Sequence, residues 1–154
     1  MPTPLAVAVN GAAGRMGQRI VALVQADEEL TLAAALEAEG NAAIGRDAGE
    51  LAGIGTIGVP VSSELGNRVD VVIDFSMPEG LTRIAQVCGE REIPLVAATT
   101  GLTEEQRESV LSASQTTPMI LAPNMSLAVN VAMKLVGEAA RALKSVPGGI
   151  DVEI

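Results

Sequence analysis

The chain has 154 residues and a net charge of −9, with one Phe and one Cys but no Trp, Tyr or His. Without histidine this sequence contains no Ser-His-Asp or Cys-His nucleophile, so any acid or base must be a carboxylate, a lysine or Cys88. The acidic charge and the lack of rings for stacking argue against nucleic acid. A lone cysteine, no apolar run of about 18 residues and no signal sequence lead us to expect a cytoplasmic domain with no membrane or metal partner.

The first elements we expect are a strand, a helix and a second strand. Residues 5–9 form a short apolar run typical of a buried strand, and residues 30–36 form another. Between them, residues 15–25 have the apolar spacing of an amphipathic helix. The apolar side chains expected on one face of that helix are Met16, Ile20, Leu23 and Val24.

The middle of the chain is first rich in glycine and then apolar. Residues 39–56 predict a loop with at most one short helix, followed by a short strand over 58–62. The β-branched run over 69–75 predicts a buried strand. Pro78 suits the first position of a helix that continues to about Arg91.

The last third continues the alternation, with strands expected over 95–98 and 119–122. Between them, Thr103-Glu-Glu-Gln106 is a capping box that opens a helix. A long helix is expected over 126–144. Strands and helices that alternate with short connections predict an α/β, Rossmann-like fold, a doubly wound parallel sheet covered by helices on both faces.

The final residues break this pattern. After a Pro-Gly-Gly turn at 147–149, residues 150–154 alternate apolar and acidic side chains, as a half-buried strand does, and such a strand needs neighbours. We therefore expect a dinucleotide-binding domain over 1–125. Residues 126–154 would then supply a crossover helix and the first strand of a second, α+β domain whose remaining strands are missing from this sequence.

A glycine-rich turn joins the first strand to the first helix. Its spacing, with glycines at 11, 14 and 17, differs from the strict G-x-G-x-x-G fingerprint, but it permits a tight turn, close approach of backbone amides to a pyrophosphate and close helix packing. Glu37 follows Gly17 by 20 residues at the end of the second strand, where an acid accepts hydrogen bonds from the adenosine ribose. The alternative is a ligand-free turn beside a solvated carboxylate.

Three later strand ends, over 74–80, 98–101 and 122–126, carry hydroxyl, amide and turn residues that suit a nicotinamide and its ribose. Ordinary loop chemistry is the alternative, and Ser126 alone is also a good helix N-cap. We expect Asp74 to fix loop amides rather than to transfer protons, and Cys88 to pack inside its helix. The methionines expected in the core are Met16, Met119, Met125 and Met133.

Four motifs occur in a specific order. They are Val9-x-Gly11-x-x-Gly14-Arg15-Met16-Gly17, Val72-Ile-Asp-Phe-Ser-x-Pro-Glu-Gly80, Thr99-Thr-Gly-Leu102, and Ala122-Pro-Asn-Met-Ser126 with Val129-Asn130. Together they resemble the 4-hydroxy-tetrahydrodipicolinate reductase (dihydrodipicolinate reductase) family over nearly the whole chain. The resemblance implies a cytoplasmic, homotetrameric oxidoreductase of the diaminopimelate and lysine pathway. Such an enzyme uses NADH or NADPH to reduce a small heterocyclic dicarboxylate to tetrahydrodipicolinate.

The resemblance also implies which residues hold the nicotinamide dinucleotide. The glycine-rich turn would hold the pyrophosphate and Glu37 the adenosine ribose, while residues 98–100 and 122–125 would lie near the nicotinamide. The implied cofactor residues are Gly11, Ala12, Ala13, Gly14, Arg15, Met16, Gly17, Glu37, Phe75, Ser76, Ala98, Thr99, Thr100, Ala122, Pro123, Asn124 and Met125.

Two positions depart from the family pattern in a way that affects cofactor choice. Members that use NADPH well often place one arginine after the ribose-binding acid and another in the Asp-Phe-Ser loop, where this chain has Ala38 and Met77. A 2′-phosphate prefers guanidinium groups, and Glu37 would repel it. We therefore predict that NADH is preferred and that NADPH binds through Arg15 or Arg46 as partial substitutes.

The family's catalytic segment, with paired histidines, a lysine and a Ser-Gly-Thr turn, follows the strand at 151–154. We therefore assign no catalytic residue to this chain and expect those residues downstream of Ile154, which makes the chain the cofactor-binding part of a longer enzyme. Two alternatives stay open. One is another dehydrogenase, such as one acting on an amino-acid semialdehyde, for which Cys88 is badly placed; the other is a non-catalytic NAD(H)-binding regulatory module.

Overall fold

The computed structural model describes residues 3–66 and 68–146, and the chain divides into two compact units between Pro123 and Asn124. The elements are β1 (Leu5–Asn10), α1 (Arg15–Ala26), β2 (Leu30–Leu36), α2 (Ala48–Leu51), β3 (Val61–Ser62), β4 (Val71–Asp74), α3 (Pro78–Arg91), β5 (Leu95–Ala97), α4 (Glu104–Ala113), β6 (Met119–Leu121) and α5 (Leu127–Leu143).

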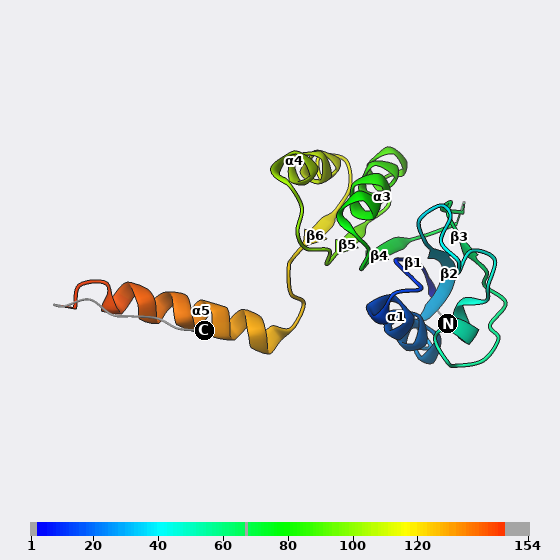
Figure 1. Ribbon diagram of the computed structural model, residues 1–154, viewed down its shortest axis with the longest axis horizontal. Helices are drawn as coiled ribbons and strands as arrows, with labels where there is room; N and C mark the ends of the chain where they lie inside the picture. Colours follow the sequence, from blue (N-terminus) through cyan, green and yellow to red (C-terminus); the bar gives the residue numbers. More distant parts are fainter. Residues whose placement is uncertain (1–2, 67, 147–154) are drawn as a thin grey trace. The chain divides into compact units, whose positions relative to one another are not determined.

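The six strands form one sheet in the order β3-β2-β1-β4-β5-β6, and every neighbouring pair is parallel (Figure 1). The chain therefore winds outward in one direction from β1 and in the other from β4, which confirms the doubly wound sheet. Asn10 lies opposite Leu36 on one side and Asp74 on the other. The carboxyl ends of β2, β1 and β4 thus meet at one edge, where ligands of such sheets bind.

Helices cover the two faces of the sheet separately. On one face α1 packs Val21 and Val24 against β1 and β2, whereas on the other α3 and α4 pack against the sheet through Leu81, Ala85 and Val110. Figure 1 shows α3 and α4 together on one side of the sheet and α1 on the other. Each large aliphatic side chain buried in this way contributes about 1.5–3 kcal/mol.

The buried face of α1 differs from the predicted one. Met16 and Leu23 are 49% and 50% exposed, whereas Gly17, Val21 and Val24 are buried. Gly17 determines which face of α1 is buried, because the absence of a side chain lets the helix backbone press against the turn at this residue. Val21 and Val24, four and seven positions later, then face the sheet. The predicted core positions of Met16, Met125 and Met133 are likewise wrong, because these side chains are exposed in the described structure.

Most other predicted elements are confirmed, some with shifted ends. The capping box holds as expected: the Gln106 amide donates to Thr103 Oγ1 at 3.2 Å and the Thr103 amide donates to Gln106 Oε1 at 3.0 Å. The strand predicted over 69–75 is shorter, since β4 begins at Val71 and ends at Asp74. The strand predicted over 150–154 lies outside the described residues. No helix in the described ranges has both the length and the apolarity to cross a bilayer.

The segment that follows β2 is organised around Asp47. Its carboxylate caps α2 by accepting from the amides of Gly49 and Glu50, and it also accepts from the amides of Ile57 and Gly58. Partial burial raises the pKa of the Asp47 carboxyl, but the four amide donors outweigh it and the net pKa lies below its usual value. These bonds close the glycine-rich loop beside the end of β2.

The second unit contains α5, and a small polar network fixes its start. Ser126 Oγ accepts from the amide of Val129 at 3.4 Å, which confirms Ser126 as an N-cap. Asn124 Oδ1 accepts from the Ser126 amide at 2.8 Å, and Asn130 Nδ2 donates to the Asn124 carbonyl at the same distance. No residue of α5 is buried in this structure.

Candidate functional site

The turn between β1 and α1 depends on two glycines. Gly11 has a φ of +78°, and a Cβ at this position would lie 2.7 Å from the Phe75 carbonyl oxygen and 2.9 Å from Ser76 Cα. A Cβ on Gly17 would overlap the carbonyl oxygen of Gly11. The turn therefore lies directly against the loop after β4 on one side and against α1 on the other, and larger residues would force these segments apart.

The backbone amides of the turn divide into two groups. The amides of Gly11 and Ala12 both donate to the Leu36 carbonyl, at 2.9 and 3.0 Å, and the Gly14 amide donates to the Gly11 carbonyl at 3.0 Å. These amides hold the turn in place. In the described part of the chain, the amides of the first turn of α1 find no acceptor, as is usual at a helix N-terminus, and so are available to an anion. They belong to Arg15 and Met16, which are exposed, and to Gly17, which is buried against the turn.

Glu37 connects the end of β2 to this turn. Its Oε1 accepts from the Ala13 amide at 2.9 Å, and its Oε2 accepts from Asn41 Nδ2 at 3.0 Å and more weakly from the Ala38 amide at 3.3 Å. A carboxylate has about four acceptor positions and three are used here, so Glu37 keeps one for a ribose hydroxyl. Asn41 is not among the residues predicted from the sequence; the signal that could have found it is a turn-forming amide four residues after the acid.

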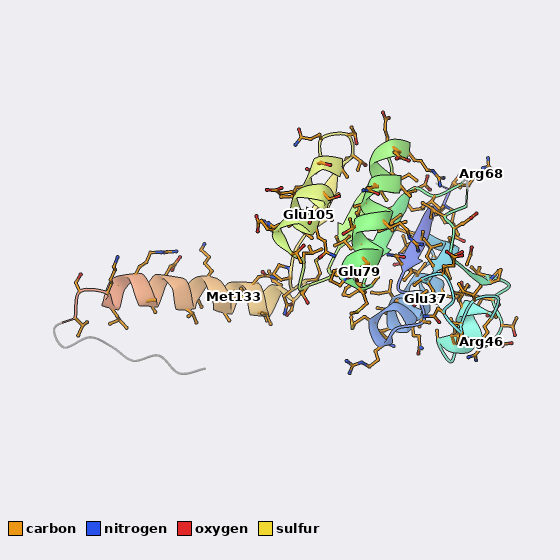
Figure 2. The ribbon with its side chains drawn as sticks, turned by 45° about the horizontal axis from the view of Figure 1, so that its top comes forward. Glu37, Arg46, Arg68, Glu79, Glu105 and Met133 are labelled. Carbon is orange, nitrogen blue, oxygen red and sulfur yellow. The ribbon has the colours of Figure 1, made fainter. Side chains whose placement is uncertain are left out.

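A cavity of about 430 Å³ lies at this edge of the sheet. The turn contributes Gly11 and Gly14, the end of β2 contributes Glu37, and the loop after β4 contributes Phe75 and Ser76. Figure 2 shows where Glu37 and Glu79, which also lines this cavity, lie on the ribbon. The structure thus brings together five residues, from three separate segments, that the sequence predicts as cofactor residues.

A second cavity, of about 230 Å³, lies at the ends of β5 and β6. Thr99, Thr100 and Pro123, all predicted to lie near the nicotinamide, line it together with Arg107 from α4. The predicted residues therefore fall into two groups, one around the point between β1 and β4 where the strand order reverses, and one farther along the sheet at the ends of β5 and β6.

The other predicted residues are placed as follows. Ala12 is buried in the core beneath the turn, and Ala13 contacts Glu37 through its amide. Ala98 and Ala122 extend the sheet through backbone hydrogen bonds just past β5 and β6. Asn124 and Met125 belong to the second unit, in which the Asn124 side chain accepts from the Ser126 amide.

Asp74 is fully buried at the end of β4, at the centre of a side-chain network. Its Oδ1 accepts from Asn10 Nδ2 at 2.7 Å and from Ser76 Oγ at 2.6 Å, and its Oδ2 accepts from Thr99 Oγ1 at 2.6 Å. The expectation that Asp74 fixes loop amides is therefore wrong, because its oxygens bind side chains. Each hydroxyl has one proton, so Ser76 and Thr99 can offer a ligand only acceptor capacity.

Cys88 packs in α3, in the core between the sheet and the helices α3 and α4, and is fully buried, as predicted. Burial raises the pKa of its thiol to about 11; nearby Arg91 lowers the pKa and Asp74 raises it. The thiol is therefore protonated near neutral pH and unsuited to nucleophilic chemistry.

A parallel sheet with this strand order, a glycine-rich turn after its first strand and an acid at the end of its second define a Rossmann-like domain of the dinucleotide-binding class. Residues 5–125 match the family model described as dihydrodipicolinate reductase, N-terminus. The chain belongs to this family, which confirms the resemblance seen in the four motifs.

Individual relatives agree with the family model. The chain is 42% identical over 156 residues to the 4-hydroxy-tetrahydrodipicolinate reductase of Rhodopirellula baltica, covering 98% of this chain and 56% of the relative. It is 46% identical over 151 residues to that of Anaeromyxobacter dehalogenans, covering 96% of this chain and 55% of the relative. The chain therefore spans about half the length of these curated relatives.

A solved structure shows the same fold. The dipicolinate-bound dihydrodipicolinate reductase from Paenisporosarcina sp. TG-14 is similar with a TM-score of 0.69 and 25% sequence identity. The similarity covers 90% of this chain and 54% of that chain.

Proposed function

We propose that this chain is the nicotinamide-dinucleotide-binding part of a 4-hydroxy-tetrahydrodipicolinate reductase of the diaminopimelate and lysine pathway. The observation that carries the proposal is the cavity in which the glycine-rich turn, Glu37 and the loop after β4 meet. Dinucleotide sites of this fold place their pyrophosphate and adenosine ribose at these positions. The family and relatives reported above support the particular reaction.

In this proposal the bound cofactor supplies a hydride from the nicotinamide C4. The free amides at the start of α1 would hold the pyrophosphate, helped by the partial positive charge of the helix terminus. Glu37 would accept hydrogen bonds from the adenosine ribose hydroxyls while it stays bonded to the Ala13 amide. Residues 99–100 and Pro123 would line the nicotinamide side.

We further propose that the substrate is a small heterocyclic dicarboxylate. It would bind to a part of a longer protein that corresponds to the half of the relatives that this chain does not span. The solved relative from Paenisporosarcina sp. TG-14 is bound to dipicolinate, a compound of this class. Groups that bind and protonate the substrate would then come from that half, as would the contacts of a homotetramer. We also propose that the dinucleotide-binding domain ends at residue 125 and that residues 126–154 begin the second domain. We propose that the protein is located in the cytoplasm.

Cofactor preference follows from the lining of the larger cavity. Ala38 and Met77 line it beside Glu37, so neither family position for an arginine offers a guanidinium to a 2′-phosphate. Glu37 accepts from ribose hydroxyls but repels an added phosphate. We therefore propose that NADH binds more tightly than NADPH.

Titrating the chain with NADH and with NADPH while following nicotinamide fluorescence tests both parts of the proposal. The chain has no Trp or Tyr to interfere with the signal. We expect saturable binding that ADP-ribose displaces, with NADH the tighter ligand. Lack of saturable binding of either dinucleotide would contradict the proposed function. Tighter binding of NADPH by tenfold, about 1.4 kcal/mol, would contradict only the preference.

A further inference from the structure

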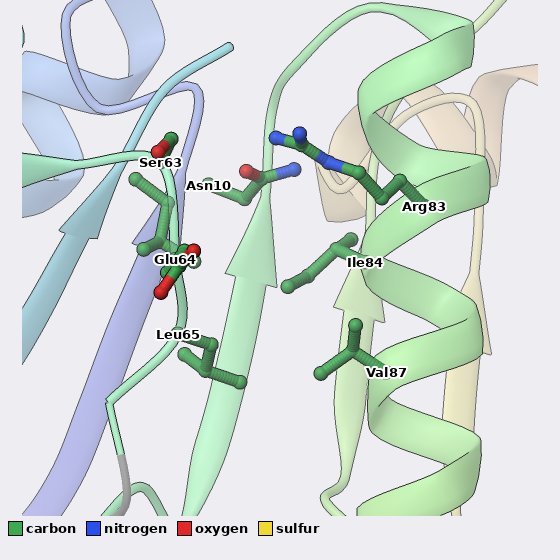
Figure 3. A pocket seen from close by; sticks show the side chains of 8 residues that line it. Asn10, Ser63, Glu64, Leu65, Arg83, Ile84 and Val87 are labelled. Atoms are coloured by element: carbon green, nitrogen blue, oxygen red, sulfur yellow. The ribbon is translucent and has the colours of Figure 1, made fainter. Parts of the chain in front are cut away.

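The cavity that contains Glu37 has a neighbour. This adjoining cavity, of about 300 Å³, shares Asn10 and Arg83 with the larger one. Leu36 and Ile84 give it apolar walls, and Glu64 lies at its side (Figure 3). Because both cavities share Asn10 and Arg83, these two residues lie where the two spaces meet.

Arg83 reaches this position from α3. The helix begins at Pro78, and Glu79 and Arg83 both line the larger cavity because residues four apart share a helix face. Figure 3 shows the Arg83 side chain extending from α3 toward Asn10. Within residues 3–66 and 68–146, its guanidinium makes no hydrogen bond and no ion pair within 4.0 Å, Glu79 included. The guanidinium is therefore available to a ligand.

The charges around the two cavities give this arginine its importance. Among the described residues, Arg83 is the one basic residue that lines either cavity, whereas the acids are Glu37, Glu64 and Glu79. Arg15 and Arg46, which the sequence suggested as substitutes for the missing family arginines, line neither.

We propose that Arg83 is a specificity-determining residue for the adenosine end of the cofactor. Its guanidinium binds the 2′-phosphate of NADPH, in the cavity that Glu37, Ala38 and Met77 also line, and so permits the weaker NADPH binding. A guanidinium fits a phosphate through two parallel hydrogen bonds, and no other described group at these cavities offers them. The inference rests on the proposed function, because it requires that a dinucleotide occupies this site.

The test compares the NADPH-to-NADH affinity ratio in the wild-type chain and in Arg83→Gln, Arg83→Lys and Arg46→Gln, each checked for folding by circular dichroism. We expect Arg83→Gln to lower the ratio about tenfold, equivalent to about 1.4 kcal/mol, with NADH affinity changed less than twofold. The ratio for Arg83→Lys should lie between those of the wild-type chain and Arg83→Gln, since lysine keeps the charge but loses the pair of parallel hydrogen bonds. Arg46→Gln, which also removes one charge, should leave the ratio unchanged.

The possible results separate the inference from the proposed function. A wild-type chain that binds neither dinucleotide contradicts the proposed function. A chain that binds NADH but shows no measurable NADPH binding overturns the role of Arg83 alone. So does an Arg83→Gln variant whose ratio is unchanged, or one in which both affinities fall in parallel, as stacking on the adenine would produce. A lower NADPH-to-NADH affinity ratio in Arg46→Gln would show that Arg46, and not Arg83, binds the 2′-phosphate.

Discussion

The two sides of the sheet's reversal point hold their strand ends together in different ways. On the β1–β2 side the contacts use backbone: the Gly11 and Ala12 amides bind the Leu36 carbonyl, and Glu37 binds the Ala13 amide. On the β4–β5 side a buried side chain, Asp74, binds the side chains of Ser76 and Thr99, and it also reaches Asn10 at the end of β1. Substitutions that enlarge a side chain should therefore destabilise the β1–β2 side most, and substitutions that shorten a side chain should destabilise the β4–β5 side most.

The largest effect is expected from Asp74→Ala. The change removes three short hydrogen bonds to a buried carboxylate and leaves Asn10 and Thr99 only their longer bonds to Ser76 and Gly80, which should lower the free energy of unfolding by about 4 kcal/mol. Asp70→Ala is a matched control, since it removes the same charge from an exposed carboxylate that accepts one bond, from the Ala6 amide. Urea unfolding measures both. Equal losses in the two variants would show that the network does not stabilise the β4–β5 side.

Gly11→Ala should come next, with a loss of about 3 kcal/mol. The alanine would have to adopt a positive φ and would press its Cβ against the Phe75 carbonyl. Gly14→Ala provides the control, because its φ is −71° and its Cβ would lie 3.2 Å from the Gly11 carbonyl oxygen. We expect the control to lose less than about 1 kcal/mol in the same urea experiment. A Gly11→Ala variant as stable as the control would mean that the turn relaxes freely.

The buried thiol of Cys88 gives the β4–β5 side a dependence on alkaline pH. Its pKa is raised from 9.0 to about 11 in the folded chain, so the unfolded chain loses this proton first. Stability is therefore fully present below pH 9 and falls by about 2–3 kcal/mol as the pH rises through 11. Unfolding measured from pH 8 to 11 should show this loss, and Cys88→Ala should lack it. An equal alkaline loss in Cys88→Ala would assign the effect to other groups.

The smallest of these effects concerns Glu37 and the cofactor. Glu37→Ala removes the proposed ribose acceptor and the anchor of the Ala13 amide, so NADH affinity should fall about tenfold, or about 1.4 kcal/mol. Asn41→Ala removes one bond to the Glu37 carboxylate and should weaken NADH only about twofold. Fluorescence titration measures both. Unchanged NADH binding in Glu37→Ala would remove Glu37 from the site.

The sequence predicts the elements well where local chemistry decides their ends. The bounds of β2 match the prediction, and α3 begins at Pro78 as expected, because strand composition and helix-start signals are local. The buried face of α1 could not be predicted, since apolar residues lie on more than one side of the helix. The choice of Val21 over Leu23 depends on how closely Gly17 approaches the turn.

In the candidate site, too, local motifs could be predicted from the sequence, but contacts that depend on tertiary packing could not. Gly11, Glu37 and Ser76, each predicted from its motif as a cofactor residue, line one cavity. The partners of Asp74 could not be foreseen, because residues 10, 76 and 99 meet only once the strands are in register. Arg83 was missed for a similar reason: only the packing of α3 shows which of its side chains reach the cavity.

We propose that the start of α1 and the end of β2 form the dinucleotide site. The most direct test is an amide NMR spectrum of the nitrogen-15-labelled chain during titration with NADH. We predict the largest shifts at the free, exposed amides of Arg15 and Met16, followed by those of Glu37 and Ala38. Saturable binding that leaves these amides unmoved, with the shifts elsewhere on the chain, would contradict the account.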